Sequence, residues 1–310
     1  MRNEQIDVMK GIAILSVALF HTTPFRGVSL FMLPTFFIIA GYFISDTSNL
    51  CSFTIKKTRR LLIPYCFFGL LYAFVGLFQF SASFCIQNLY NLLLGGQNLT
   101  GWFGTFWFVN ILFIALIIDR VLYTFVHNKY VLLCLSVCFL SMAMFVDGSS
   151  INYLWGVQHL PIVLGYILLG NFIQHQLPID KMNGICYPNW LFFASISFFA
   201  FIILFTPKTI VMDIKYNEYG VKGFSIILSL ISVLCVAIIS LKLVEFYKVK
   251  RFLSWCGEVS LCFMFVHQFI HLHIPENWHW PLQFLITVSI SLLVCFIVTK
   301  TRKCKVIFGC

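Results

Sequence analysis

Residues 8–25 read VMKGIAILSVALFHTTPF, an apolar run with a single formal charge at Lys10. Similar runs, separated by connections, follow near residues 28–45, 61–81, 103–126, 130–147, 156–174, 186–206, 222–244, 252–273 and 280–299. A helix of roughly 20 residues crosses a hydrocarbon core of about 30 Å. The sequence therefore predicts an all-α, polytopic integral membrane bundle of about ten transmembrane helices.

The composition of the whole chain agrees with this prediction. Of its 310 residues, 60% are hydrophobic and 10% are charged, and the mean hydropathy is +0.92. A water-soluble domain carries far more charge and cannot bury so much apolar surface. We therefore expect a single membrane-embedded domain over residues 1–310, without a sizeable soluble domain.

The distribution of Lys and Arg predicts the orientation, since short cytoplasmic loops collect positive charge. With ten spans and both termini in the cytoplasm, 17 of the 21 cations fall on the inner side. Glu4 and Asp7 precede Lys10 and no small-residue cleavage site follows, so the first stretch is expected to be an uncleaved helix. The inner cations are Arg2, Lys10, Lys56, Lys57, Arg59, Arg60, Arg120, Lys129, Lys181, Lys242, Lys248, Lys250, Arg251, Lys300, Arg302, Lys303 and Lys305, and the outer ones are Arg26, Lys208, Lys215 and Lys222.

This asymmetry also accounts for the net charge of +10. Anionic lipid of the inner leaflet, or an anionic cytosolic ligand, is a more suitable partner for it than nucleic acid, which we do not expect to bind. The expected location is the plasma (inner) membrane. No metal site is predicted, because most of the twelve cysteines lie in apolar stretches and the Cys134 and Cys138 pair has no neighbouring histidine.

Lys10 and His21 form the first chemically informative pair. They are eleven residues apart, and eleven steps of 100° come within about 20° of three full turns, so both side chains share one helix face. The rise between them is roughly 16 Å. A snorkelling lysine with a structural histidine explains this pair as well as a functional site does.

Four cations, Lys56, Lys57, Arg59 and Arg60, stand directly before an apolar stretch at an expected inner boundary. Such clusters commonly set orientation and bind anionic lipid. They can also clamp phosphate, since Arg forms bidentate bonds to phosphate and Lys adds a point charge.

Six short motifs, in one order over about 260 residues, resemble those of acyltransferase family 3, a family of integral membrane proteins. The first is a basic residue and a histidine with ten residues between them. The residues that carry the resemblance are Asp7, Lys10 to Ile14 and His21; Pro34 to Tyr42; Lys57, Arg60 and Pro64; Trp107 and Phe108; Gly165 and Tyr166; and Gly257, Ser260, Leu261 and His267.

The resemblance implies a ten-helix architecture and transfer of an acyl group, most often acetyl from acetyl-CoA, to sugar hydroxyls of surface polysaccharides and related glycans. Lys10 and Lys57 depart from it, because many relatives carry Arg there and a bidentate phosphate grip would be weaker with Lys. Glu258 falls where the family pattern is loose and receives no role.

Together these observations predict an O-acetyltransferase. Lys57 and Arg60, helped by Lys10, are expected to bind the phosphates of cytosolic acetyl-CoA or another acyl-CoA, a co-substrate rather than a permanently bound cofactor. His21 is the predicted catalytic residue, as general base or as a covalent acyl carrier.

Trp107 and His267 are the predicted substrate-binding residues. Trp107 can stack on a sugar or simply pack, and His267 can be a buried structural residue. A secondary transporter with a proton relay through His21 and Glu258 is the alternative function, although no inverted repeat supports it. A scaffold without chemistry is a third interpretation, and no sequence feature specifies an oligomeric state.

Overall fold

The computed structural model describes residues 3–44, 49–126, 128–145, 152–178, 181, 188–221 and 223–300. Over these residues the chain is helical, and its extended pairing is limited to an isolated bridge between Asp213 and Glu218. The predicted all-α fold is confirmed. Several cations of the orientation argument lie outside the described residues, namely Arg2, Lys222, Arg302, Lys303 and Lys305.

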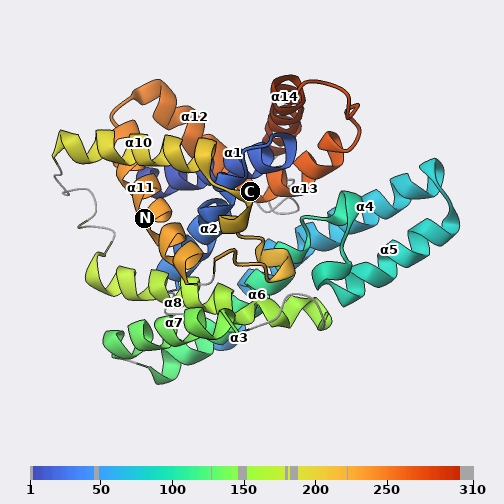
Figure 1. The fold of residues 1–310 in the computed structure, drawn as a ribbon. Helices are drawn as coiled ribbons and strands as arrows, with labels where there is room; N and C mark the ends of the chain where they lie inside the picture. The colour runs from blue at the N-terminus through green and yellow to red at the C-terminus, as the bar shows by residue number, and fades with distance from the viewer. Residues whose placement is uncertain are drawn as a thin grey trace.

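The helices follow one another along the chain as Figure 1 shows. They are α1 (Glu4–Thr22), α2 (Met32–Tyr42), α3 (Leu50–Lys57), α4 (Ile63–Gln79), α5 (Ala82–Leu94), α6 (Trp107–Phe125), α7 (Lys129–Ala143), α8 (Leu160–Gln176), α10 (Asn189–Phe205), α11 (Phe224–Leu243), α12 (Tyr247–Glu258), α13 (Ser260–His271) and α14 (Trp280–Thr299).

The apolar helices are those expected of a multi-pass membrane protein. In the described part of the chain, six are long and apolar enough to cross a bilayer, and the bent pair α12 and α13 adds a seventh. Three shorter apolar helices cover Arg26–Tyr42, Lys129–Ala143 and Asn189–Phe205. These segments coincide with the ten apolar stretches of the sequence, while ten crossings and cytoplasmic termini stay predictions.

Helix α1 lies at the centre of the bundle and contacts α2, α11, α12, α13 and α14 (Figure 1). Its crossing with α12 is very close. A side chain at Gly11 would collide with the backbone carbonyl of Leu253, and one at Gly257 would collide with that of Asp7. Small residues permit such close packing of helices in a membrane. This contact fixes the N-terminal half of α1, which carries Lys10.

A single helical stretch of 30 residues, Leu50–Gln79, joins α3 to α4 through a π-helical turn at Thr58–Leu62. Pro64 has no N–H to donate to the carbonyl of Arg60, and its ring crowds that carbonyl. The amide of Ile63 instead bonds to the carbonyl of Thr58, five residues back. The basic cluster therefore lies in and beside a turn with a non-standard register.

Helix α5 differs from the prediction, because the apolar pattern predicts only a connection over residues 82–102. Ser81 caps it by accepting a hydrogen bond of 3.2 Å from the amide of Phe84. The helix then runs back along α4, and the hydroxyl of Tyr65 donates to the carbonyl of Leu92 over 2.7 Å. In Figure 1, α4 and α5 form a hairpin that projects from the bundle.

The predicted stretch 252–273 is not one straight span. Helices α12 and α13 meet at Val259 with a bend of 79°. Lys248, Lys250 and Arg251 make the first half of α12 strongly charged, and such a segment cannot continue through hydrocarbon. The apolar helix therefore begins only at Ser260.

Candidate functional site

A cavity of about 1160 Å³ runs between the central helices. This volume lies somewhat above the range of about 300–1,000 Å³ typical of small-molecule sites. Side chains of α1, α2, α3, α6, α12 and α13 line it, together with the loop at Asp213–Tyr216. Segments from the whole length of the chain therefore share one site.

One end of the cavity, which we name the inner end after the predicted topology, is cationic. Lys56, Lys57 and Arg60 line it, whereas the neighbouring Arg59 does not. The ammonium of Lys57 also lies over the ring of Phe53, 5.0 Å from its centroid. Three of the four cations of the cluster thus face one space, as side chains three and four positions apart on a helix do.

Lys10 joins this end from α1. Its ammonium is 3.3 Å from a carboxylate oxygen of Asp7, one turn earlier on the same helix. Glu258, at the end of α12, lines the cavity as well. The cavity therefore holds acidic as well as basic groups at this level, and Asp7 partly offsets the charge of Lys10.

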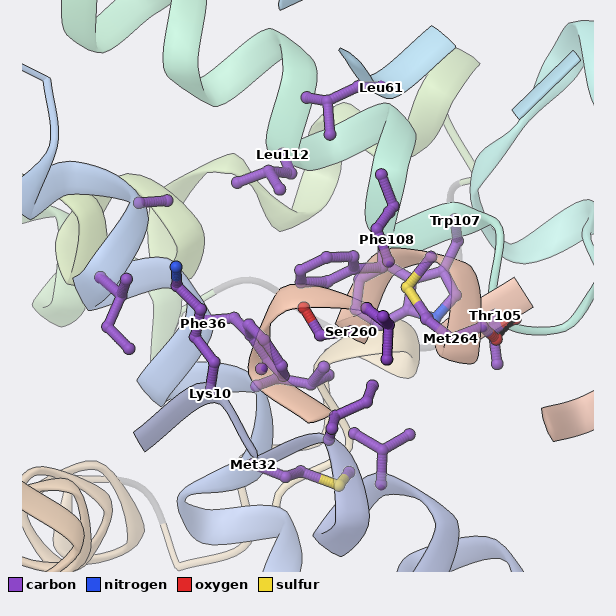
Figure 2. Close-up of a pocket in the computed structure, with 18 of the residues that line it drawn as sticks. Lys10, Met32, Phe36, Leu61, Thr105, Trp107, Phe108, Leu112, Ser260 and Met264 are labelled. Atoms are coloured by element: carbon purple, nitrogen blue, oxygen red, sulfur yellow. Dashed lines mark hydrogen bonds between the residues drawn. The ribbon is translucent and has the colours of Figure 1, made fainter. Parts of the chain in front are cut away.

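Apolar side chains form the middle of the cavity. Phe36, Phe108 and Met264 surround it in Figure 2, and Leu112 and Leu61 lie further along the same wall. An apolar passage of this kind excludes bulk water and favours an apolar part of a ligand over a hydrated polar group.

His21 lies in the last turn of α1 and lines the cavity. Its ring contacts the edge of Phe20, with centroids 5.4 Å apart. Among the described residues neither of its ring nitrogens has a hydrogen-bond partner. Lys10 and His21 both line the cavity, so their shared helix face is directed toward one space.

His267 lies behind His21, with the ring centroids 5.4 Å apart, and does not line the cavity. Its Nδ1 is 3.0 Å from the carbonyl of Phe263. Because a carbonyl can only accept, Nδ1 carries the hydrogen and Nε2 is an acceptor. Nε2 is buried without a partner among the described residues. Direct contact between His267 and a substrate therefore stays a prediction.

Trp107 begins α6 and lines the cavity, although it is only 6% exposed. Its ring meets that of His159 edge to face, with centroids 5.4 Å apart. His159 is held by Asn217, whose side-chain oxygen lies 2.7 Å from Nδ1. Trp107 is thus packed firmly and offers only a small part of its ring to a ligand.

Part of the connection between α10 and α11 lines the opposite end of the cavity, which we name the outer end after the predicted topology. Asp213, Lys215 and Tyr216 line the cavity. Burial lowers the pKa of Lys215 to about 8, although the carboxylate of Asp213 acts in the opposite direction. Burial also raises the pKa of Asp213. No short motif could have identified this loop, because its position depends on the folded bundle.

A buried polar pair on α6 and α8 was also missed. The side chain of Asn171 donates to Asp119 over 3.2 Å, and both residues are fully buried. The neighbouring Arg120 lies over Phe53, 5.8 Å from its centroid, on the ring that Lys57 also contacts. The adjacent charges of Asp119 and Arg120 within an apolar stretch were the available signal.

The structure therefore brings Lys10, His21, Lys57, Arg60 and Trp107 to one cavity. His267 is one ring away from it. Lys56, Lys215 and Gln268 are additional lining residues that were not predicted as site residues.

Two comparisons with known proteins bear on this site. Over 220 residues the chain is 28% identical to the Nodulation protein NolL of Mesorhizobium japonicum. The matched region covers 65% of this chain and 55% of NolL. The chain thus spans about half the length of this curated relative. No solved structure matches the chain. The family model described as an acyltransferase domain, that of acyltransferase family 3, matches residues 3–300, and the chain therefore belongs to this family.

Proposed function

We propose that this protein is an integral membrane O-acyltransferase that moves acetyl from acetyl-CoA to a sugar hydroxyl of a surface polysaccharide or lipid-linked glycan. One observation carries the proposal: a single cavity has Lys56, Lys57 and Arg60 at one end and His21 further along it. Membership of acyltransferase family 3 supports the reaction class. The proposed location is the plasma (inner) membrane.

The donor is proposed to bind with its phosphates at the inner end. Arg60 supplies a planar pair of donors for phosphate, and Lys57 and Lys10 add charge. From Lys10 to His21 the helix rises by roughly 16 Å. The pantetheine arm would follow the apolar walls along this distance and bring its thioester to His21. The part of the cavity beyond His21 would then be left for the acceptor.

His21 is proposed to act as general base. It takes the proton of the acceptor hydroxyl while that oxygen bonds to the thioester carbon. The carbon–sulfur bond then breaks, and the leaving thiolate takes the proton from the imidazolium. The products are the sugar ester and free CoA. In the covalent variant, His21 attacks the thioester first and passes the acyl group to the hydroxyl afterwards.

His267 is proposed to position His21 rather than to touch the substrate. Its unpartnered Nε2 can accept a hydrogen bond from His21, directly or through one water, across rings whose centroids are 5.4 Å apart. Such a bond would place the hydrogen of His21 on the side of His267 and leave the other nitrogen basic toward the cavity.

A transfer assay tests the proposal. Membranes that contain the protein are given acetyl-CoA labelled in the acetyl group, and the glycan fractions of the cell are examined for label that mild base removes. We expect label with the parent protein and none with His21→Gln. Equal label in both would exclude His21 chemistry. Absence of transfer by folded parent protein would contradict the proposed function and favour the transporter interpretation.

A further inference from the structure

We infer that the loop Asp213–Glu218 forms the acceptor site of the cavity and that Lys215 holds a neutral, hydroxylated acceptor glycan by donating a hydrogen bond to one of its oxygens. This inference rests on the proposed function. It assigns a binding role to Lys215, which the sequence indicates only as one of the cations of a predicted outer connection.

The position of Lys215 is fixed by backbone contacts. Its ammonium donates to the carbonyl of Leu99 over 2.6 Å and to that of Gly104 over 3.3 Å. The side chain of Gln97 in turn donates to the carbonyl of Lys215 over 2.9 Å. The loop is thus anchored to the segment that leads into α6, and the ammonium is held at the cavity wall.

One donor of Lys215 is left for a ligand. An ammonium carries three hydrogens, and the two carbonyls account for two of them. Among the described residues Lys215 forms no ion pair with a carboxylate within 4 Å. The ring of Tyr216 lies beside the ammonium, 5.3 Å from centroid to nitrogen, and also lines the cavity. A donor next to an aromatic face suits a sugar, which offers oxygens at its rim and C–H groups on its face.

Gln268 provides a second polar group at this end. It lines the cavity one residue after His267, and its side-chain oxygen is buried without a partner among the described residues. Leaving such a group unpaired costs free energy that a bound hydroxyl would recover. Lys215 can donate to a sugar oxygen while Gln268 accepts from a sugar hydroxyl. Both groups share the cavity with His21, the proposed base.

The charge at this end favours a neutral acceptor. Asp213 lines the cavity next to Lys215, and the side-chain oxygen of Asp213 accepts from the amide of Lys215 over 3.1 Å. The carboxylate therefore offsets the ammonium, and a carboxylate or phosphate on the acceptor would meet repulsion as well as attraction.

A labelling experiment tests occupancy without requiring transfer. The purified full-length protein in lipid nanodiscs is treated with an amine-reactive reagent, with and without surface glycan of the producing cells from which mild base has removed O-acyl groups. We expect the glycan to reduce labelling of Lys215 at least about threefold and to leave that of Lys208 unchanged. Lys208 is exposed on the same connection and outside the cavity. Equal labelling of Lys215 with and without glycan would overturn the inference.

Kinetics of variants separate binding from a structural role. Lys215→Met should raise the KM for glycan about tenfold and leave the KM for acetyl-CoA unchanged, and Lys215→Arg should restore much of the loss. Gln97→Ala loosens the same loop without removing the ammonium and is the matched control. An equal rise in the glycan KM of Gln97→Ala would overturn the inference. If the parent transfers no acyl group, the proposed function fails, while the labelling result still decides the role of Lys215.

Discussion

At its inner end the cavity takes its charge from Lys56, Lys57 and Arg60, which are close together in one helical stretch, whereas at its outer end a loop distant in sequence supplies Lys215. Lys56, Lys57 and Arg60 are exposed or partly buried, and so many cations within five residues can be recognised as a candidate anion site from the sequence alone. Lys215 shares its connection with Lys208, without a dense cluster of cations, and is held by two backbone carbonyls. Local charge density thus indicates a site for a polyanion, while a site built from single groups becomes visible only in the fold.

Topology is the prediction with the largest effect, because each reporter gives an all-or-none answer. Fusions after residues 50, 128 and 182, and at the C-terminus, should report the cytoplasm, and fusions near residues 98, 150 and 214 should report the opposite side. One reversed middle loop would break the comparison, since the two ends of the cavity would no longer face different compartments.

The next largest effect is expected at His21, which lines the same cavity as the basic cluster and Lys215. His21→Gln keeps a hydrogen-bonding side chain but cannot take a proton near neutral pH, so transfer should fall by a factor of roughly 10² to 10⁴. Size-exclusion behaviour in detergent checks that the variant folds. A folded variant whose rate is within a few fold of the parent would remove His21 from the mechanism.

The inner end can be tested with two adjacent arginines. Arg60 lines the cavity and Arg59 does not. Loss of charge-assisted bonds to phosphate in Arg60→Ala should raise the KM for acetyl-CoA about tenfold, and Lys57→Ala should raise it less.

Arg59→Ala, which removes the same charge from the same inner boundary, should leave the donor KM close to that of the parent. If both arginine variants insert wrongly and neither changes the donor KM, the cluster acts in orientation alone.

A smaller effect is expected from pH at the outer end. Because burial lowers the pKa of Lys215 to about 8, its ammonium is lost as pH rises through that value, whereas an exposed lysine stays charged to about pH 10.4. The glycan KM of the parent should therefore rise a few fold between pH 7 and pH 9.

Lys215→Arg, which stays charged, is the control for this pH series and should show a flat glycan KM. Three other titratable groups interact electrostatically with the ammonium of Lys215, namely Asp213 on the same loop, His21 and His159. A parent profile as flat as that of the Arg variant would contradict the role of the ammonium.

Much of the fold was predictable because membrane helices must be long, apolar and internally hydrogen-bonded. The face shared by Lys10 and His21 followed from helix geometry alone. Helix α5 was missed because its polar residues Gln87 and Asn91 interrupt the apolar pattern. The bend at Val259 was missed because hydropathy averages over a window that contains both halves.

The position of His267 and the role of Lys215 could not be predicted for a different reason. Each depends on which helices become neighbours, and a list of spans does not contain that information. His267 shares a motif with Ser260 on one helix, yet its distance from the cavity is decided by α1 packing across it.

The π-helical turn at Thr58–Leu62 makes the number of residues in this stretch part of the proposed donor site. Such a turn holds one residue more than an α-helical turn, and each residue rotates the helix by about 100°. Deleting a single residue there would rotate Lys57 by about 100° relative to Tyr65, and would therefore turn it away from the cavity if Tyr65 kept its contact with α5. A frame-preserving deletion of Thr58 should therefore impair donor binding as much as loss of a cation does, although every charge is retained.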